Sequence, residues 1–229
     1  MHKVSVILTV YNKPQWLREA IDSVISQTYE DWELLIMEDN SPLPEVREII
    51  ESYFPNDKIK VFYSDVTEEE RYKTARYATL INYAVYNMCS GDYITYLTDD
   101  DFYYPHRLEK MIEAISVDGV NIVYGNQQIV DVDGNHAGVR HIDGILDNAW
   151  NKVDHNSVMH KKELFYEVGG WDNTPDIWGG ADAHFWRKLT DAGHKFYPVG
   201  EIDDKPLEAK RYHTGSVQWL VHNGLFFPS

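Results

Sequence analysis

Three consecutive carboxylates near the middle of the chain, Asp99–Asp101, are the residues best suited to chemistry. They follow directly on the apolar residues 93–97, whose β-branched and aromatic side chains predict a buried strand. The acids are therefore expected at the edge of a sheet, where they repel one another unless a cation or hydrogen-bond donors neutralise them. A hard divalent ion that carries a diphosphate would meet this need. The alternative is an acidic turn that caps the next helix.

Polar residues also end two other predicted strands. Thr9, Tyr11 and Asn12 close the first strand, and Asp39 closes the second. Each group alone is weak evidence, because Asn and Asp are common in turns. Open α/β sheets bind ligands beyond the carboxyl ends of their strands, so neighbouring parallel strands would bring the groups to one crevice.

The first 125 residues alternate between strand and helix patterns, which predicts right-handed βαβ units on a parallel sheet. Strands are expected over residues 3–10, 32–37, 58–63, 92–97 and 121–124, and helices over 14–27, 43–54, 71–88 and 105–115.

The pattern changes after residue 125. A hairpin is expected over residues 127–132 and 136–140, with short helices over 161–168 and 181–192 and short strands over 196–199 and 210–212. The predicted fold class is therefore α/β, with a mixed, mainly parallel sheet flanked by helices and a loop-rich second half. We expect a nucleotide-binding lobe (1–125) and an acceptor-binding lobe (126–229) within one domain.

Composition excludes several classes of protein. A chain of 229 residues is long enough for one large domain. Its formal net charge of −16 argues against binding to nucleic acid and against docking on anionic membranes. The single cysteine, Cys89, rules out an internal disulfide and is expected to be a buried structural thiol. Residues 4–10 are too few to cross a bilayer, so we expect a cytoplasmic protein with no integral membrane segment.

Several segments resemble inverting family 2 glycosyltransferases of the GT-A fold. They are residues 4–12, 27–34 and 38–41, and residues 91–94 leading to the acids. Residues 74–82, 93–100, 155–160 and 182–186 are most similar to a spore coat polysaccharide glycosyltransferase of that family. The resemblance extends from residue 3 to about residue 217. It implies transfer of a sugar from a UDP- or dTDP-sugar to a hydroxyl of a carbohydrate acceptor by direct displacement.

The resemblance also implies a set of donor contacts. Asp39 would accept a hydrogen bond from the base edge, and Tyr11 would stack on a pyrimidine, with Thr9 and Asn12 close by. Arg71 and Arg76 fall in a stretch that approaches the donor phosphates or sugar.

For the metal, the resemblance implies that Asp100 ligates the Mg²⁺ or Mn²⁺ of the donor diphosphate, while Asp99 contacts the ribose or the metal. His213 matches a segment whose histidine reaches the metal or the diphosphate, and an ordinary buried histidine is the alternative. Thr98 stands where many family members have Asp. Which of the acids ligate the metal is therefore open, and Asp101 is a further candidate ligand. Adjacent strand residues point to opposite faces, so Asp99 and Asp100 can share an ion only where the strand has turned.

Asp182 matches the family's general base. Chemistry supports this role, because an acid at a helix start is stabilised as the anion by the helix dipole. Such a carboxylate can deprotonate an attacking hydroxyl, while a metal stabilises the leaving diphosphate. The preceding Gly179 and Gly180 allow a loop to approach a ligand closely. The alternative is that Asp182 only caps its helix.

Three further residues are expected near the acceptor: Trp178, Gly180 and His160. Trp178 would stack on a sugar or pack in the core. His155 and His160 flank a strand-like segment, and each would shape the acceptor pocket or pack. A second acidic pair, Asp131 and Asp133, also fits an Asp-x-Asp pattern, but Gly134 follows it and predicts a hairpin turn.

Two other functions are compatible with parts of this pattern. A sugar nucleotidyltransferase would need a glycine-rich basic loop after the first strand, whereas residues 11–14 contain no glycine. A non-catalytic nucleotide-sugar-binding domain would lack the base or the acids, and both are present. The apolar tail, residues 219–227, is expected to dock on another partner or on a second copy of the chain. Docking on a second copy would make a homodimer.

Overall fold

The computed structural model describes residues 2–200 and 206–214 of the chain. The tail at residues 219–227, with the dimer contact predicted for it, lies outside these residues.

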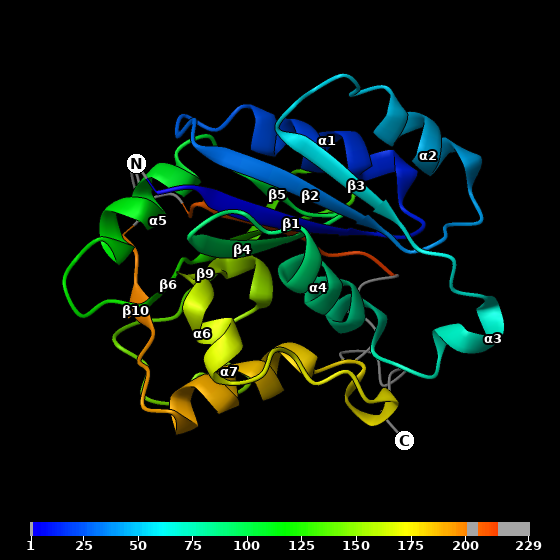
Figure 1. The fold of residues 1–229 in the computed structure, drawn as a ribbon. Coiled ribbons are helices and arrows are strands. Elements are labelled where there is room, and N and C mark those ends of the chain that lie inside the picture. Colours follow the sequence, from blue (N-terminus) through cyan, green and yellow to red (C-terminus); the bar gives the residue numbers. More distant parts are fainter. Residues whose placement is uncertain (1, 201–205, 215–229) are drawn as a thin grey trace.

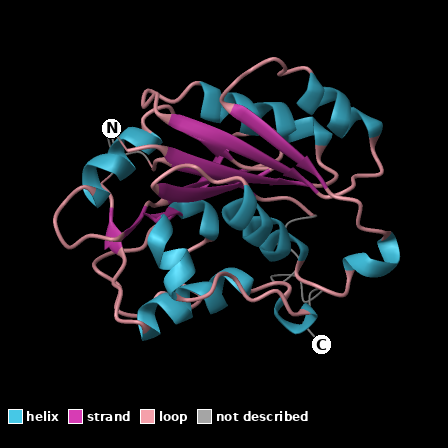
Figure 2. Ribbon diagram, in the orientation of Figure 1, coloured by secondary structure: helices cyan, strands magenta, loops and turns pink. Residues whose placement is uncertain are grey.

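A seven-stranded sheet forms the centre of the molecule (Figures 1 and 2). Its first four strands in the chain are mutually parallel, as predicted, and β9 runs antiparallel to both of its neighbours. In spatial order the strands are β10 (Tyr197–Pro198), β6 (Ile122–Tyr124), β9 (Val158–Lys161), β4 (Tyr93–Thr98), β1 (Val4–Val10), β2 (Trp32–Glu38) and β3 (Ile59–Tyr63).

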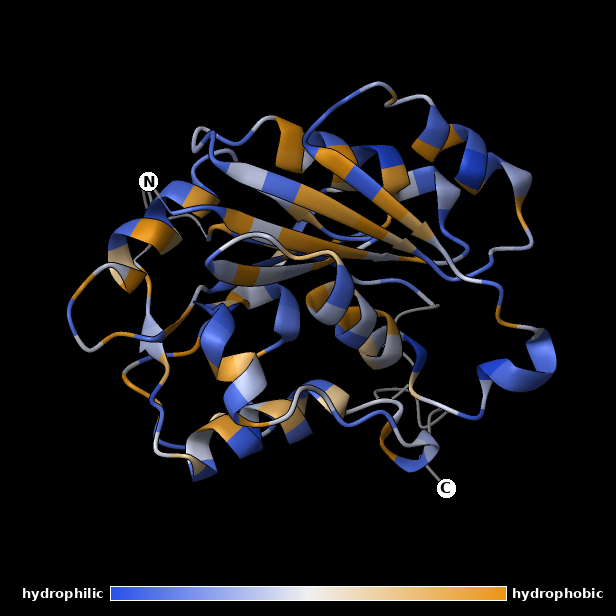
Figure 3. Cartoon of the chain, viewed as in Figure 1, coloured by the Kyte–Doolittle hydropathy of each residue, from blue (hydrophilic) through white to orange (hydrophobic). Residues whose placement is uncertain are grey.

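Helices cover both faces of this sheet, because its central strands are apolar on both sides. In β1, Val6 and Leu8 face one core while Ile7 faces the other, as the alternation of a strand requires. The first core also contains residues of α1 (Pro14–Ile25), α2 (Pro44–Glu51) and α5 (Arg107–Ile115). The second contains residues of α4 (Arg76–Asn87), α6 (Lys162–Glu167) and α7 (Ala181–Asp191). Figure 3 shows the apolar residues concentrated on the central strands.

A smaller, four-stranded sheet lies beside the acids and has the order β5 (Phe102–Tyr103), β11 (Glu208–Arg211), β7 (Gln127–Val130), β8 (His136–Arg140). The β7–β8 hairpin was predicted. In its turn Asp131 accepts the backbone N–H groups of Asp133 and Asn135, each at 2.9 Å, so this acidic pair does serve the turn.

Two of the differences from the prediction bear on the site. The helix expected over residues 71–88 is two helices, α3 (Glu68–Arg71) and α4, because Thr67 and Glu70 form a capping box that starts α3 early. The Ala75 amide then donates to the Asn173 carbonyl at 2.9 Å instead of continuing the helix. The other difference is β9, which enters the main sheet between β4 and β6, so residues beyond 125 complete that sheet.

Cys89 is partly buried, and burial raises the pKa of its thiol to about 11, which fits an unreactive structural role. Among residues 2–200 and 206–214, no helix has both the length and the apolar character needed to cross a membrane.

Candidate active site

A cavity of about 450 Å³ opens where β1, β2 and β4 end, at the carboxyl edge of the parallel strands. Most of the residues predicted to do chemistry converge on it, although they come from segments far apart in the chain. Those that line the cavity are Thr9, Tyr11, Asn12, Asp39, Arg71, Arg76, Asp99, Asp100, Trp178 and Asp182.

Asp39 lies at one side of the cavity between two arginines. Arg71 Nη1 donates to its carboxylate, and Arg76 Nη2 donates to Asp39 Oδ1 at 2.6 Å. The Arg71 guanidinium also lies over the Tyr11 ring, 3.9 Å from the ring centre. An aromatic face, a carboxylate and two cations therefore meet in one place, which suits a heterocyclic base that carries phosphates.

Asp99 and Asp100 are buried where β4 ends, and each has a defined set of partners. Asp99 Oδ2 accepts the Tyr11 amide N–H at 2.9 Å. Asp100 Oδ2 lies 2.7 Å from Lys13 Nζ and 2.8 Å from His213 Nε2. Burial alone would raise the pKa of Asp100, but the Lys13 ammonium and the His213 contact hold it well below its usual range. Burial raises the pKa of Asp99, against the opposing effect of Lys13.

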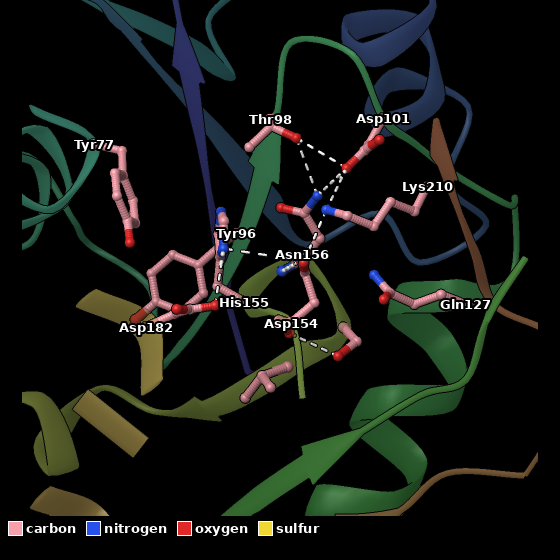
Figure 4. Close-up of polar contacts among 12 residues, drawn as sticks. Tyr77, Tyr96, Thr98, Asp101, Gln127, Asp154, His155, Asn156, Asp182 and Lys210 are labelled. Atoms are coloured by element: carbon pink, nitrogen blue, oxygen red, sulfur yellow. Dashed lines mark hydrogen bonds and ion pairs between the residues drawn. The ribbon is translucent and has the colours of Figure 1, made fainter. Parts of the chain in front are cut away.

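Asp101 is not part of the cavity lining and holds the two sheets together instead (Figure 4). It accepts hydrogen bonds from Thr98 Oγ1 at 3.0 Å and from the Arg211 amide of β11 at 2.7 Å. Lys210 Nζ lies 3.4 Å from Asp101 Oδ2, the oxygen that also accepts from Thr98. Burial raises the pKa of Asp101 to about 6. Asp101, the further candidate metal ligand, thus makes structural contacts instead.

Lys13 is a site residue that the sequence analysis missed. Its Nζ contacts Asp100 and lies 3.4 Å from Asp99 Oδ1, and it lines the cavity. Burial would lower its pKa, but the two carboxylates raise it above its usual range, so the side chain is a fixed cation. A basic residue in the turn after the first strand was the available signal, but a lysine in a turn is usually solvated.

The side chains near Asp100 fit a divalent ion that arrives with a diphosphate. Asp100 and His213 offer one oxygen and one nitrogen donor, and Mg²⁺ commonly uses one or two carboxylates together with substrate phosphates. Within residues 2–200 and 206–214, no group of three or more His, Cys, Asp or Glu side chains is arranged to hold an ion alone. The phosphates would therefore have to supply the remaining ligands.

Asp182 lies in the first turn of α7, and its side chain is 21% exposed. Its Oδ1 accepts the Ala183 amide N–H at 2.8 Å, which satisfies one free amide of the helix start. The Tyr77 hydroxyl accepts the Ala181 amide N–H at 2.9 Å and fixes where the helix begins. Trp178, at 37% exposure, lines the cavity together with Gly179. Gly180 is the N-cap of α7 and is not among the lining residues.

His160 does not reach the cavity, which corrects the expectation of an acceptor contact. It is fully buried in the core and contacts the Tyr96 hydroxyl at 2.7 Å and the Lys161 carbonyl at 2.8 Å. Because a carbonyl only accepts, His160 Nδ1 carries the proton and Nε2 accepts from Tyr96. Packing, the alternative left open by the sequence, describes its role.

The fold and this site together define a class of protein: an α/β domain with an acid-lined crevice at its strand ends, suited to a nucleotide diphosphate. Comparison of the sequence with models of protein families identifies the family. The model of glycosyl transferase family 2 matches residues 5–171, so the chain belongs to that family, and the domain is a glycosyltransferase domain.

Relatives agree with this assignment. Protein CgeD of Bacillus subtilis is 42% identical over 212 residues, covering 88% of this chain and 49% of CgeD. An uncharacterised glycosyltransferase of Rickettsia conorii is 32% identical over 237 residues, covering 96% of this chain and 36% of its own length. The putative glycosyltransferase EpsE of Bacillus subtilis is 25% identical over 226 residues, covering 94% of this chain and 78% of EpsE. The chain thus spans half or less of the first two relatives.

Solved structures confirm the fold. The domain is similar to residues 1–349 of Staphylococcus aureus TarS in complex with UDP-GlcNAc, with a TM-score of 0.70 and 14% identity over 93% of this chain and 60% of that one. It is also similar to the mannosyltransferase PcManGT of Pyrobaculum calidifontis in complex with GDP-Man and Mn²⁺, with a TM-score of 0.67 and 14% identity over 96% of this chain and 59% of that one. The predicted mixed, mainly parallel GT-A architecture is confirmed.

Proposed function

We propose that this domain is a metal-dependent, inverting glycosyltransferase that moves a sugar from a UDP- or dTDP-sugar to a hydroxyl of a glycan. The observation that carries the proposal is the lining of one cavity by both a metal-competent acid, Asp100, and an acid at a helix start, Asp182. A direct displacement needs one stabiliser of the leaving group and one base, and this cavity offers a candidate for each.

The donor nucleotide would bind where Asp39, Tyr11 and the two arginines meet. The Tyr11 ring would stack on a pyrimidine, and Asp39 would accept from the base edge. Asp39 is shared by Arg71 and Arg76, so an arginine released from it by the nucleotide becomes available to the phosphates. Thr9 and Asn12 complete the wall beside β1.

Asp100 and His213 would hold the Mg²⁺ or Mn²⁺ of the donor, with Asp99 beside them. When bound, the ion supplies positive charge to the departing diphosphate. Asp99 is tied to the Tyr11 amide at 2.9 Å, so it links the acid cluster to the nucleotide wall and leaves Asp100 as the main protein ligand.

Asp182 would take the proton of the acceptor hydroxyl as the oxygen attacks the anomeric carbon from the face opposite the diphosphate, which inverts that carbon. It lies in the first turn of α7, at the positive end of the helix dipole. Trp178 would provide an apolar face for the acceptor sugar.

The donor class and metal are supported by the structures of similar fold, which were determined with UDP-GlcNAc or with GDP-Man and Mn²⁺. The acceptor is proposed from the resemblance of residues 155–160 and 182–186 to a spore coat polysaccharide glycosyltransferase, as a polysaccharide of a spore or cell surface. Dimerisation through residues 219–227 remains part of the proposal.

The test is release of UDP or dTDP from a panel of nucleotide sugars with Mn²⁺, using water or added glycans as acceptors. Asp182→Asn should lower kcat by about 10³-fold and leave nucleotide affinity unchanged, because general-base catalysis contributes about 10²–10⁴-fold. The control is Asp176→Asn. Asp176 is an exposed acid that shortly precedes Asp182 in the chain, and it does not line the cavity. Nucleotide binding without turnover of any sugar in the panel would favour the non-catalytic binding domain.

A further inference from the structure

His155 is placed between two carboxylates at the floor of the cavity. Its Nδ1 atom lies 3.7 Å from Asp182 Oδ2 and 3.9 Å from Asp154 Oδ1 (Figure 4). It belongs to a short 3₁₀ helix, His155–Ser157, that precedes β9, and it also lines the cavity. The sequence left open whether His155 shapes the acceptor pocket or packs in the core, and it gave the residue no part in proton transfer.

The ring of His155 is held by aromatic neighbours. The Tyr77 ring stacks on it at a centroid distance of 5.7 Å and an interplanar angle of 28°. The Trp171 ring meets it edge-on, at 6.0 Å and 89°, and Tyr96 does so at 6.2 Å. Tyr77 is also the residue whose hydroxyl binds the Ala181 amide at the start of α7. One aromatic cluster therefore fixes both the imidazole and the helix that carries Asp182.

The hydrogen-bond partners indicate which ring nitrogen carries the proton. Among residues 2–200 and 206–214, the buried His155 Nε2 finds no hydrogen-bond partner, whereas Nδ1 faces both carboxylates. A buried N–H without a partner costs about 1–3 kcal/mol, more than a bare lone pair would cost beside apolar rings. The proton is therefore placed on Nδ1, where it points at the acids.

Asp154 acts as the fixed end of this arrangement. Its Oδ2 lies 2.8 Å from Lys210 Nζ, and its Oδ1 accepts the Asn156 amide N–H at 3.1 Å. Burial alone would raise the pKa of Asp154, but Lys210 and His155 hold it well below its usual range. Asp154 is thus an anion at neutral pH that keeps the imidazole turned toward Asp182.

We propose that His155 is a positioning residue for Asp182, holding that carboxylate in the orientation in which it receives the acceptor proton. The inference rests on the proposed function, in which Asp182 is the base. Asp182 Oδ1 is bound to the Ala183 amide, so a second contact at Oδ2 removes the remaining rotation of the carboxylate. The distance of 3.7 Å between Nδ1 and Oδ2 is longer than a hydrogen bond, and catalytic contacts of this kind tighten when substrate binds.

The charge environment agrees with this arrangement. Burial would lower the pKa of His155, but Asp182 and Asp154 raise it above its ordinary value against the smaller opposing effect of Lys210. The alternative is that His155 serves only to pack against Tyr77. The two readings differ in whether the Nδ1 donor, rather than the ring, is required.

Two substitutions separate the donor from the ring. His155→Phe keeps an aromatic ring against Tyr77 and removes the donor, while His155→Asn restores a donor near Nδ1 and removes most of the ring. We expect His155→Phe to lower kcat about 10–100-fold, since a small misplacement of a catalytic group costs about that much. The donor KM and the affinity for UDP with Mn²⁺ should stay unchanged, and His155→Asn should recover most of kcat. Loss of activity in His155→Asn with retention in His155→Phe would show a packing role and overturn the proposal.

A second readout does not depend on turnover. Nitrogen-15 spectra of the imidazoles, with the His155 signal assigned by its loss in His155→Asn, should show a protonated Nδ1 that shifts in Asp182→Asn. The buried His160 signal should stay in place, because its partners are Tyr96 and the Lys161 carbonyl. A proton on Nε2 of His155, or a signal indifferent to Asp182→Asn, would contradict the assignment.

The outcomes distinguish this inference from the function beneath it. If the wild type turns over and Asp182→Asn does not, while His155→Phe matches the wild type, the inference fails and the base assignment stands. If Asp182→Asn is as active as the wild type, the proposed function of Asp182 fails whatever the His155 variants do. The double variant Asp182→Asn, His155→Phe should be no slower than Asp182→Asn alone, because His155 acts only through Asp182.

Discussion

Lys13 Nζ lies 2.7 Å from Asp100 Oδ2, the same oxygen that His213 Nε2 contacts at 2.8 Å. A lysine ammonium therefore neutralises the acid pair at the position where the proposed donor-bound ion would be needed. The lysine side chain is 24% exposed and lines the cavity, so the neutralising cation lies on the cavity side of the acids. Neutralisation of the acids by one cation or another is a requirement of the fold as well as of the chemistry.

Replacement of Lys13 tests whether the buried acids require a cation. Lys13→Met should lower the free energy of unfolding by about 3 kcal/mol in EDTA, because it leaves buried carboxylates without their cation. Added Mn²⁺ should recover part of the loss, since the ion binds the folded state. Urea unfolding with and without Mn²⁺ measures both effects. The matched control is the exposed Lys73→Met; equal losses in the two variants, or no response to Mn²⁺, would count against the account.

Acid should weaken the fold partly through His160. Burial lowers the pKa of this histidine to about 4, from an ordinary value of 6.5. The unfolded chain therefore binds the proton first, and stability that is complete above about pH 6.5 is lost as the pH falls toward about 4. The loss from this group approaches about 3 kcal/mol.

The measurement is the free energy of unfolding at a series of pH values for the wild type and His160→Gln. The variant should be less stable at pH 7 and should lose about 3 kcal/mol less than the wild type down to pH 4. Its kcat should fall by much less than that of Asp182→Asn. Parallel pH profiles for the two proteins would show that His160 is not a buried neutral group.

Gly91 allows β1 and the start of β4 to approach closely. A Cβ at this position would lie 2.7 Å from the Lys3 carbonyl oxygen and 2.7 Å from two atoms of Ser5. Because two of these contacts are backbone atoms, Gly91→Ala should destabilise the protein by about 2–3 kcal/mol. Gly138→Ala is the control, since in the described part of the chain no atom outside its two chain neighbours lies within 4 Å of its Cβ position. Thermal unfolding of the two variants compares them, and equal melting temperatures would refute the close approach.

The first four strands of the main sheet were predictable because each is an apolar run that ends in polar residues. Residues 156–159 are strand-like in the sequence, but the place of β9 in the sheet was not predictable, because its partners β4 and β6 are not its neighbours in the chain. The start of α3 did leave a signal: Thr67 and Glu70 match a capping box.

The site was predictable where a residue type is unusual for its place, as with Asp100 at the end of a buried strand. Lys13 and His155 were not predictable, because their importance depends on partners that only the folded chain brings near. Asp101 was ambiguous in the sequence, since a partner as remote as Arg211 decides its role. His160 could not be separated from a pocket residue without knowing that Tyr96 and the Lys161 carbonyl satisfy both of its nitrogens.

The central claim is that the acids at the end of β4 bind a metal-bound nucleotide diphosphate. Isothermal titration of UDP and dTDP, with and without Mn²⁺, tests it on the wild type, on Asp100→Asn and on the control Asp133→Asn in the hairpin turn. The account predicts binding that needs Mn²⁺, collapses in Asp100→Asn and is unchanged in Asp133→Asn. Nucleotide binding that is indifferent to both Mn²⁺ and Asp100 would contradict it.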